Sequence, residues 1–361
     1  MKHIISASVL FASCAFLLSG CKKDDDSSTT ETRTNQEIQS DLLRDFSSVI
    51  AFPVYQQMEN QMTAFYNACT TLQQQTDQTN LENARNAWKT VRGTWEKSES
   101  FLFGPVSTNN IDPSTDTWPV DYNALDSLLN TSNAFTQVFV QSLGDELKGY
   151  HPSEYLLWGS DGNKTAAQFT ARELEYLIAL SADLQIKATA LRNSWDPSVN
   201  DNYSWEITNA GNNMSVYPSQ KSGMEEIVNA MAGICDEVAN GKISEPFTAA
   251  DPSLEESPFS NNSLTDFKNN IMGVEMVYHA KFNSDGTGLE DFLKNNNLTL
   301  HNKIVNQLNN ALTAFNGVTV PFGQAITSQP TQVQNLIDRI NELKTTLEDE
   351  LLPFIQTTVT E

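Results

Sequence analysis

A histidine and a glutamate three residues apart are the pair in this chain best placed to do chemistry together. His151 and Glu154 lie in Gly149-Tyr-His-Pro-Ser-Glu-Tyr-Leu-Leu-Trp-Gly159. Pro152 lacks a backbone N–H and has a φ near helical values, which suits the first position of a helix, so we expect His151 to be the N-cap. Because residues three apart share a helix face, the imidazole and the carboxylate can meet at one point.

A purely structural role for Glu154 is the alternative. A glutamate in the first helical turn often accepts a hydrogen bond from the cap's backbone N–H and suits the helix dipole. The spacing is also not that of a zincin, because the chain contains no His-Glu-x-x-His. A zinc peptidase would therefore have to assemble its ligands from distant segments.

A second group of charged residues lies on an expected helix over residues 81–103. Arg92, Glu96 and Glu99 are separated by steps of four and three, so they fall on one narrow arc beside a stripe of tryptophans. Partial desolvation there favours hydrogen bonding among them or their use as ligands for a hard cation. A structural ion pair on a half-exposed helix face is the alternative.

Two loops add further polar groups. The turn-rich segment 111–121 brings three carboxylates toward the next helix, those of Asp112, Asp116 and Asp121. The polar, proline-containing segment 251–262 carries Glu-Ser-x-Phe-Ser. Loops held on a rigid helical frame are where binding sites tend to lie.

The first residues have the pattern of an export signal. A basic start, an apolar run too short to span a membrane and a Leu-Ser-Gly-Cys ending resemble the signal and lipobox of bacterial lipoproteins. We therefore expect residues 1–20 to be a lipoprotein signal peptide, Cys21 to be lipidated, and residues 21–37 to form a flexible tether. An acidic run after Cys21 resembles the signal of surface-exposed lipoproteins, and a solubilising linker is the alternative.

The composition excludes one class of partner. The formal net charge is −23, so we expect no nucleic acid partner, because such binding depends on Lys and Arg neutralising phosphates. A strongly acidic chain does attract cations, although the charge can also serve solubility alone. Cys69 and Cys235 lie in helix-like segments far apart in sequence, which favours buried thiols over a disulfide framework or a metal site.

From about residue 37 onward, apolar residues recur at helical spacing, and few stretches alternate as strands do. The pattern predicts an all-α protein, with a long first helix over 41–75 that is kinked at Pro53. The length of the ordered part predicts two helical lobes. We place an N-terminal helical bundle at residues 38–200 and a C-terminal helical bundle at residues 201–361.

Four segments together resemble the imelysin family of bacterial envelope proteins. They are Trp88-x3-Arg92-x2-Trp95-Glu96-x-Ser98-Glu99, the Asp112–Asp121 segment, Gly149-x-His151-x2-Glu154, and Glu256-Ser-x-Phe-Ser260 followed by Asn270-x2-Gly273. The resemblance implies two related helical bundles packed side by side, with the signature residues gathered between them. It also implies a role in iron uptake or sensing, and the family's name comes from a peptidase activity.

These observations lead to one expected site and three functional hypotheses. We expect a metal, iron or zinc, held by His151, Glu154, Glu96 and Glu99, with further ligand-binding residues at Arg92, Asp116, Asp121, Ser257, Ser260 and Asn270. The first hypothesis is a metal-binding lipoprotein of the outer membrane, on its periplasmic face or the cell surface, working with envelope iron-transport partners. The alternatives are a metallopeptidase of the imelysin type and a metal-free surface module that binds glycan or peptide on its tryptophans.

Overall fold

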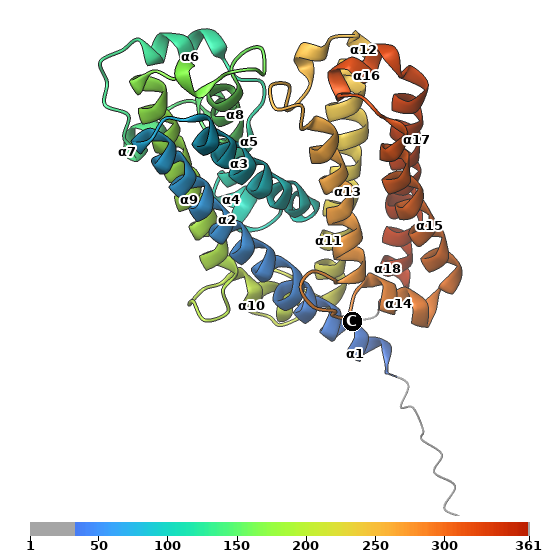
Figure 1. Cartoon of the computed structure of the whole chain (residues 1–361). Coiled ribbons are helices and arrows are strands. Elements are labelled where there is room, and N and C mark those ends of the chain that lie inside the picture. The colour runs from blue at the N-terminus through green and yellow to red at the C-terminus, as the bar shows by residue number, and fades with distance from the viewer. Residues whose placement is uncertain (1–32, 360–361) are drawn as a thin grey trace, which may run out of the picture. The chain divides into compact units, whose positions relative to one another are not determined.

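A computed structural model describes residues 33–359 of the chain, and those residues are helical with no strand (Figure 1). The predicted all-α class is therefore confirmed. Nine α-helices precede residue 200, with the following bounds: α1 (Asn35–Asp45), α2 (Phe52–Gln74), α3 (Gln78–Ser98), α4 (Pro105–Thr108), α5 (Ile111–Asp116), α6 (Tyr122–Leu129), α7 (Gln137–Gln141), α8 (Tyr150–Trp158) and α9 (Ala171–Trp195).

Nine more α-helices follow, with the following bounds: α10 (Tyr203–Thr208), α11 (Gln220–Asp236), α12 (Ser244–Ala249), α13 (Ser263–His279), α14 (Leu289–Asn296), α15 (Leu298–Ala314), α16 (Phe322–Ser328), α17 (Pro330–Thr346) and α18 (Leu352–Thr358). From Thr34 onward, the described residues form one compact unit. The division into bundles at residue 200 stays a prediction. Helix α1 packs against α11 and α14 as well as α10, so the first helix reaches into the second half of the chain.

The expected long first helix is continuous but changes its winding before Pro53. Helix α1 passes through a π-helical stretch, Phe46–Ala51, directly into α2. Pro53 is the second residue of α2 and directly follows the π-helical stretch. The winding of the helix therefore changes next to the proline at which the sequence predicted a kink.

Helix α8 begins earlier than the sequence predicted. His151 is its second residue and not the N-cap, because Gly149 precedes the helix with a φ of 94°. A side chain at Gly149 would have to pass within 2.1 Å of the Thr115 carbonyl oxygen, so glycine permits both the turn and the close approach of α5. The end of α8 is held by Arg85, whose guanidinium donates to the Leu157 carbonyl oxygen at 2.9 Å.

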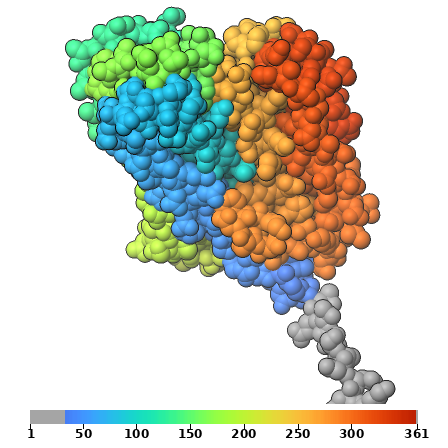
Figure 2. Space-filling model, viewed as in Figure 1, coloured from blue at the N-terminus to red at the C-terminus, as the bar shows by residue number. Residues whose placement is uncertain are grey.

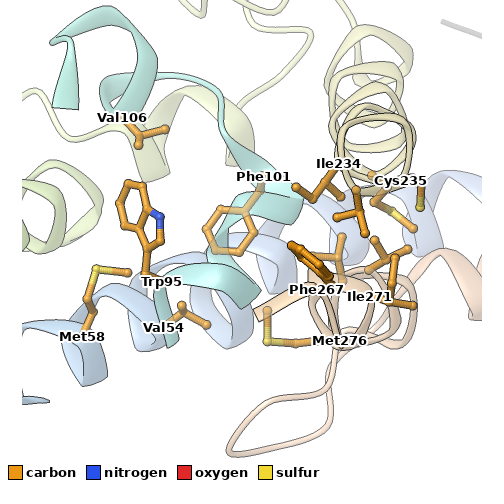
Figure 3. Close-up of a cluster of buried hydrophobic side chains, with 14 of the residues drawn as sticks. Val54, Met58, Trp95, Phe101, Val106, Ile234, Cys235, Phe267, Ile271 and Met276 are labelled. Carbon is orange, nitrogen blue, oxygen red and sulfur yellow. The ribbon is translucent and has the colours of Figure 1, made fainter. Parts of the chain in front are cut away.

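One apolar core runs across the middle of the described residues. Phe101 lies between the side chains of α2 and α3 and those of α11 and α13 (Figure 3). Helices α3 and α13 pack closely because Gly273 has no side chain, and a Cβ there would lie 2.3 Å from the Lys97 carbonyl oxygen. Figure 2 shows side chains of the two sequence halves in contact along the face in view. This packing fixes α3 against α13, and both helices carry site residues.

Three sequence predictions bear on other parts of the chain. Cys69 and Cys235 are free and buried, as expected. The signal peptide and the lipidated Cys21 lie outside the described residues, and so does most of the tether. Among residues 33–359, no helix combines the length and the apolar character needed to span a bilayer.

Candidate functional site

Arg92, on the inner face of α3, is the centre of a buried cluster of charges. Its side chain is fully buried and its guanidinium contacts three carboxylates. Nη2 lies 2.6 Å from Glu96 Oε1 and 2.9 Å from Glu256 Oε1, and Nη1 pairs with Asp116 Oδ1. Asp266 Oδ1 lies farther off, 4.0 Å from Nε. The arginine therefore joins α3, α5, α13 and the 251–262 loop.

Asp116, the last residue of α5, links Arg92 to His151. Its Oδ1 lies 3.0 Å from His151 Nε2, and its Oδ2 accepts a hydrogen bond of 2.7 Å from Trp95 Nε1. The imidazole is fully buried against Trp118, with ring centroids 5.1 Å apart, and its Nδ1 has no hydrogen-bond partner. The contact with Asp116 orients the ring, and neither ring nitrogen forms a well-aligned hydrogen bond.

Glu154 contacts the second half of the chain and does not cap its own helix. Its Oε1 accepts two hydrogen bonds from Ser260, from the backbone N–H at 2.7 Å and from the hydroxyl at 2.6 Å. Its Oε2 is buried without a partner. His151 and Glu154 therefore share a helix face, as predicted, but their polar atoms engage different neighbours. Glu154 therefore does not have the helix-capping role that was the alternative prediction.

Lys242 is the second cation of the cluster. It lies in a π-helical stretch, Glu237–Ile243, between α11 and α12. Its Nζ lies 2.9 Å from Glu99 Oε2, 2.9 Å from Glu256 Oε1 and 3.7 Å from Glu96 Oε2. The same acids are bound from α13, where Asn270 Nδ2 donates to Glu96 Oε2 at 2.8 Å and to Glu99 Oε2 at 2.6 Å.

We call this set the acid cluster. It comprises five carboxylates around two cations, namely Glu96, Glu99, Asp116, Glu256 and Asp266 around Arg92 and Lys242. The acids outnumber the cations, so full ionisation would leave uncompensated negative charge in a buried place. Such an arrangement requires protons on some of the acids or a further cation.

The pKa values indicate which acids hold protons. Burial raises the pKa of Glu99 to about 8, although Lys242 opposes the rise. Burial likewise raises the pKa of Glu96 and of Asp266 well above the ordinary range, with Arg92 opposing in both. Asp116 is the exception, because its pairing with Arg92 and His151 outweighs burial and holds its pKa far below the usual value.

The pKa of the histidine shifts in the opposite direction. Burial lowers the pKa of His151 below its ordinary value, although the hydrogen bond with Asp116 opposes the fall. A neutral imidazole is the form that binds metal ions.

A cleft of about 400 Å³ opens onto the acid cluster. Residues from both halves of the sequence line it, including Glu99, Asp112, Asp116, Trp118, Glu237, Lys242, Glu245 and Glu256. Six of the twelve lining residues are acidic and one is a lysine, so the cleft attracts cations and repels anions. Burial raises the pKa of Asp112, at the cleft wall, to about 6.

Three groups of side chains have the spacing of metal ligands. The groups are Asp116–His151–Glu256, Glu96–Glu99–Asp116 and Glu96–Glu256–Asp266, and within each one the ligand atoms lie within 4.8 Å of one another. The groups overlap, so they describe one region. Imidazole with carboxylates is a donor set that suits iron or zinc. Unpartnered buried atoms, His151 Nδ1, Glu256 Oε2 and Asp266 Oδ2 among them, leave donor capacity for an ion.

The structure brings some of the predicted site residues together and leaves others apart. Arg92, Glu96, Glu99, Asp116, His151 and Asn270 come together as described above. Glu154 and Ser260 form a neighbouring contact, and Glu154 belongs to none of the three ligand groups. Ser257 is buried nearby, where its backbone N–H donates to Ser263 Oγ at 3.0 Å. Asp121 is exposed and caps α6 by accepting a hydrogen bond of 2.9 Å from the Ala124 N–H, so it lies apart from the acid cluster.

Sequence reasoning missed three members of the site. Glu256 begins a quoted motif and Asp266 lies between that motif and Asn270, but neither was identified as a charged partner of Arg92. Nothing in the sequence pattern identified Lys242 as a site residue, because a lysine in a polar helical stretch is ordinarily solvated. It lies in a π-helical stretch and pairs with Glu99, far away in the sequence, and local patterns reveal neither feature.

Comparison with known proteins agrees with this architecture. The imelysin family profile matches residues 51–349. Iron-regulated protein A of Synechococcus elongatus is 30% identical over 351 residues, which cover 96% of this chain and 92% of the relative. A solved structure described as an iron-regulated protein A precursor, from Parabacteroides distasonis, has a TM-score of 0.80 at 27% identity, covering 88% of this chain and 95% of the other.

A second solved structure extends the likeness in fold. It is an imelysin-like protein from Psychrobacter arcticum, with a TM-score of 0.73 at 13% identity, covering 91% of this chain and 99% of that one. Because the family profile spans most of the chain, this protein belongs to the imelysin family.

Proposed function

We propose that this imelysin-family protein is a lipid-anchored protein of the cell envelope that binds a transition metal, with iron favoured, in iron uptake or sensing. The observation that carries the proposal is the acid cluster, in which buried carboxylates outnumber cations beside an imidazole with an unpartnered nitrogen. The relatives named iron-regulated protein A favour iron over zinc. A neutral imidazole and carboxylates also suit that metal.

The proposed ligands are His151, Asp116 and Glu256, with Glu96 and Glu99 close enough to complete the coordination. A bound cation would supply the positive charge that the excess of buried acids lacks. Without a metal, the contact of 3.0 Å between Asp116 Oδ1 and His151 Nε2 holds the imidazole in one orientation. Glu154 has a different part in this proposal, since its contacts with Ser260 tie α8 to the 251–262 loop.

Metal content is the direct test. We expect protein purified without chelator to contain about one equivalent of iron or zinc by elemental analysis, and His151→Ala to lose most of it because one ligand is gone. His279→Ala is the matched control, since that imidazole pairs with Glu290 at 2.9 Å, away from the cluster. Equal metal content in all three proteins would refute the ligand assignment.

The membrane anchor is tested separately. We expect Cys21→Ala to move the protein from the membrane fraction to the soluble fraction, because the proposed acyl chains are attached through that sulfur. A single acyl chain binds membranes only marginally, so more than one is expected on the wild-type cysteine. Wild-type levels of the variant in washed membranes would show that the anchor is assigned to the wrong residue.

A further inference from the structure

Lys242 occupies the kind of position in which a metal ion would be bound. Its ammonium lies 2.9 Å from an oxygen of Glu99 and 2.9 Å from an oxygen of Glu256. An ammonium group is a compact point charge, so it neutralises these oxygens much as a bound cation would. Glu256 belongs to two of the three ligand groups and Glu99 to the third. A metal that binds these acids must therefore compete with the lysine.

Unsatisfied acceptors next to Lys242 indicate that its ammonium does not complete the site. Glu256 Oε2 and Asn270 Oδ1 are buried and have no hydrogen-bond partner. Both residues are more than nine-tenths buried. Asn270 donates to Glu96 and Glu99, and Glu256 pairs with Lys242. A buried acceptor without a donor is costly, and a cation with several open coordination positions can satisfy more of them than one ammonium.

The ammonium of Lys242 can move out of the acid cluster, whereas the guanidinium of Arg92 cannot. The Lys242 side chain is 11% exposed and lines the cleft, whereas Arg92 is fully enclosed. Glu237, one turn earlier on the same π-helical stretch, lies 3.5 Å from Nζ and its side chain is 51% exposed. A rotation of the flexible lysine side chain would thus bring the ammonium to a solvated carboxylate at the mouth of the cleft.

We propose that Lys242 is an internal competitor for a divalent cation. In the metal-free protein its ammonium contacts the carboxyl oxygens of Glu99 and Glu256. A cation that enters through the cleft takes those oxygens, and the ammonium moves out toward Glu237. The exchange replaces one positive charge with two at the acid cluster and needs no redox step. This inference rests on the proposed metal-binding function and specifies how metal affinity is limited.

The test is the affinity for Mn²⁺, an ion that carboxylates bind well and that is stable in air. We expect Lys242→Met to bind Mn²⁺ ten- to a hundredfold more tightly than wild type in calorimetric titrations at pH 7, because no ammonium has to be displaced. Lys242→Gln gives a second measurement if the methionine variant does not fold, and it should also bind more tightly. Lys344→Met is the matched control, since Lys344 pairs with Asp236 on the outer surface.

The outcomes separate this inference from the proposed function. If wild type binds Mn²⁺ and neither Lys242 variant binds it more tightly, competition by Lys242 is refuted while the metal site stands. If wild type and both variants fail to bind Mn²⁺, the inference fails, and the metal content of the wild-type protein decides separately whether the proposed function stands. Binding by the variants with little or none by wild type supports the competition directly.

Discussion

Arg92→Met should lower the free energy of unfolding by about 3–5 kcal/mol, the usual cost of removing one partner from a buried ion pair. The guanidinium contacts Glu96, Asp116 and Glu256, whose side chains are at most 7% exposed. Methionine fills a similar volume, so the loss reflects buried charge more than a cavity. Urea unfolding followed by circular dichroism measures the effect.

Arg339→Met provides the comparison for Arg92→Met. Arg339 pairs with Glu342 on the surface of α17, where both side chains are more than a third exposed. Exposed pairs contribute little, so we expect a change within about 0.5 kcal/mol there. If Arg92→Met were as stable as Arg339→Met, the charges of the acid cluster could not be coupled as described.

Glu154→Gln should change how stability depends on pH. Burial raises the pKa of Glu154 to about 8, although the hydrogen bonds from Ser260 oppose the rise. Between the unfolded value near 4.5 and about 8, the folded protein therefore holds a proton that the unfolded chain releases. Stability due to this group is fully present below pH 4.5 and is lost as the pH rises toward 8, by up to about 1.4 kcal/mol per pH unit.

Glutamine does not titrate, so the variant should lose less stability than wild type between pH 5 and pH 8. Unfolding titrations at pH 5, 6, 7 and 8 measure the free energy of unfolding of both proteins. Subtracting one curve from the other removes the contributions of Glu99 and His151, which wild type and variant share. Glu342→Gln, at an exposed position, is expected to give a curve parallel to wild type. A Glu154→Gln curve that also runs parallel would mean that Glu154 is ionised throughout.

The sequence predicted contacts within one helix better than contacts between helices. Arg92 and Glu96 are four residues apart on α3, so helical geometry alone brings them together, and they lie 2.6 Å apart. Glu256 is 164 residues from Arg92 and yet lies 2.9 Å away. Nothing in the local pattern specifies that contact, because it depends on how the 251–262 loop packs against α3.

The pair that first suggested chemistry illustrates the same limit. His151 and Glu154 do share a helix face, but the partner of each is set by a different element of the fold. Asp116 reaches His151 because α5 approaches the backbone of Gly149, and Ser260 reaches Glu154 from the second half of the chain. The positive φ of Gly149 also moved the start of α8 ahead of His151, which the proline signal alone did not reveal.

Asp121 shows where a sequence pattern was too permissive. Asp116 and Asp121 of the turn-rich segment were both expected in the site, but of these two only Asp116 lines the cleft, together with Asp112. Asp121 stands where α6 begins and caps that helix. An aspartate just before a helix has a local hydrogen-bonding role available, which competes with any distant one.

The central claim is that the acid cluster binds a metal ion, and diffraction from crystals soaked with Fe²⁺ or Zn²⁺ tests it most directly. Anomalous scattering at the metal edge locates the ion independently of any variant. We expect a peak at the acid cluster, about 2.0–2.2 Å from ligand atoms of His151, Asp116 and Glu256, with Lys242 moved toward the cleft. A peak elsewhere, or no peak with Lys242 still between Glu99 and Glu256, would contradict the account.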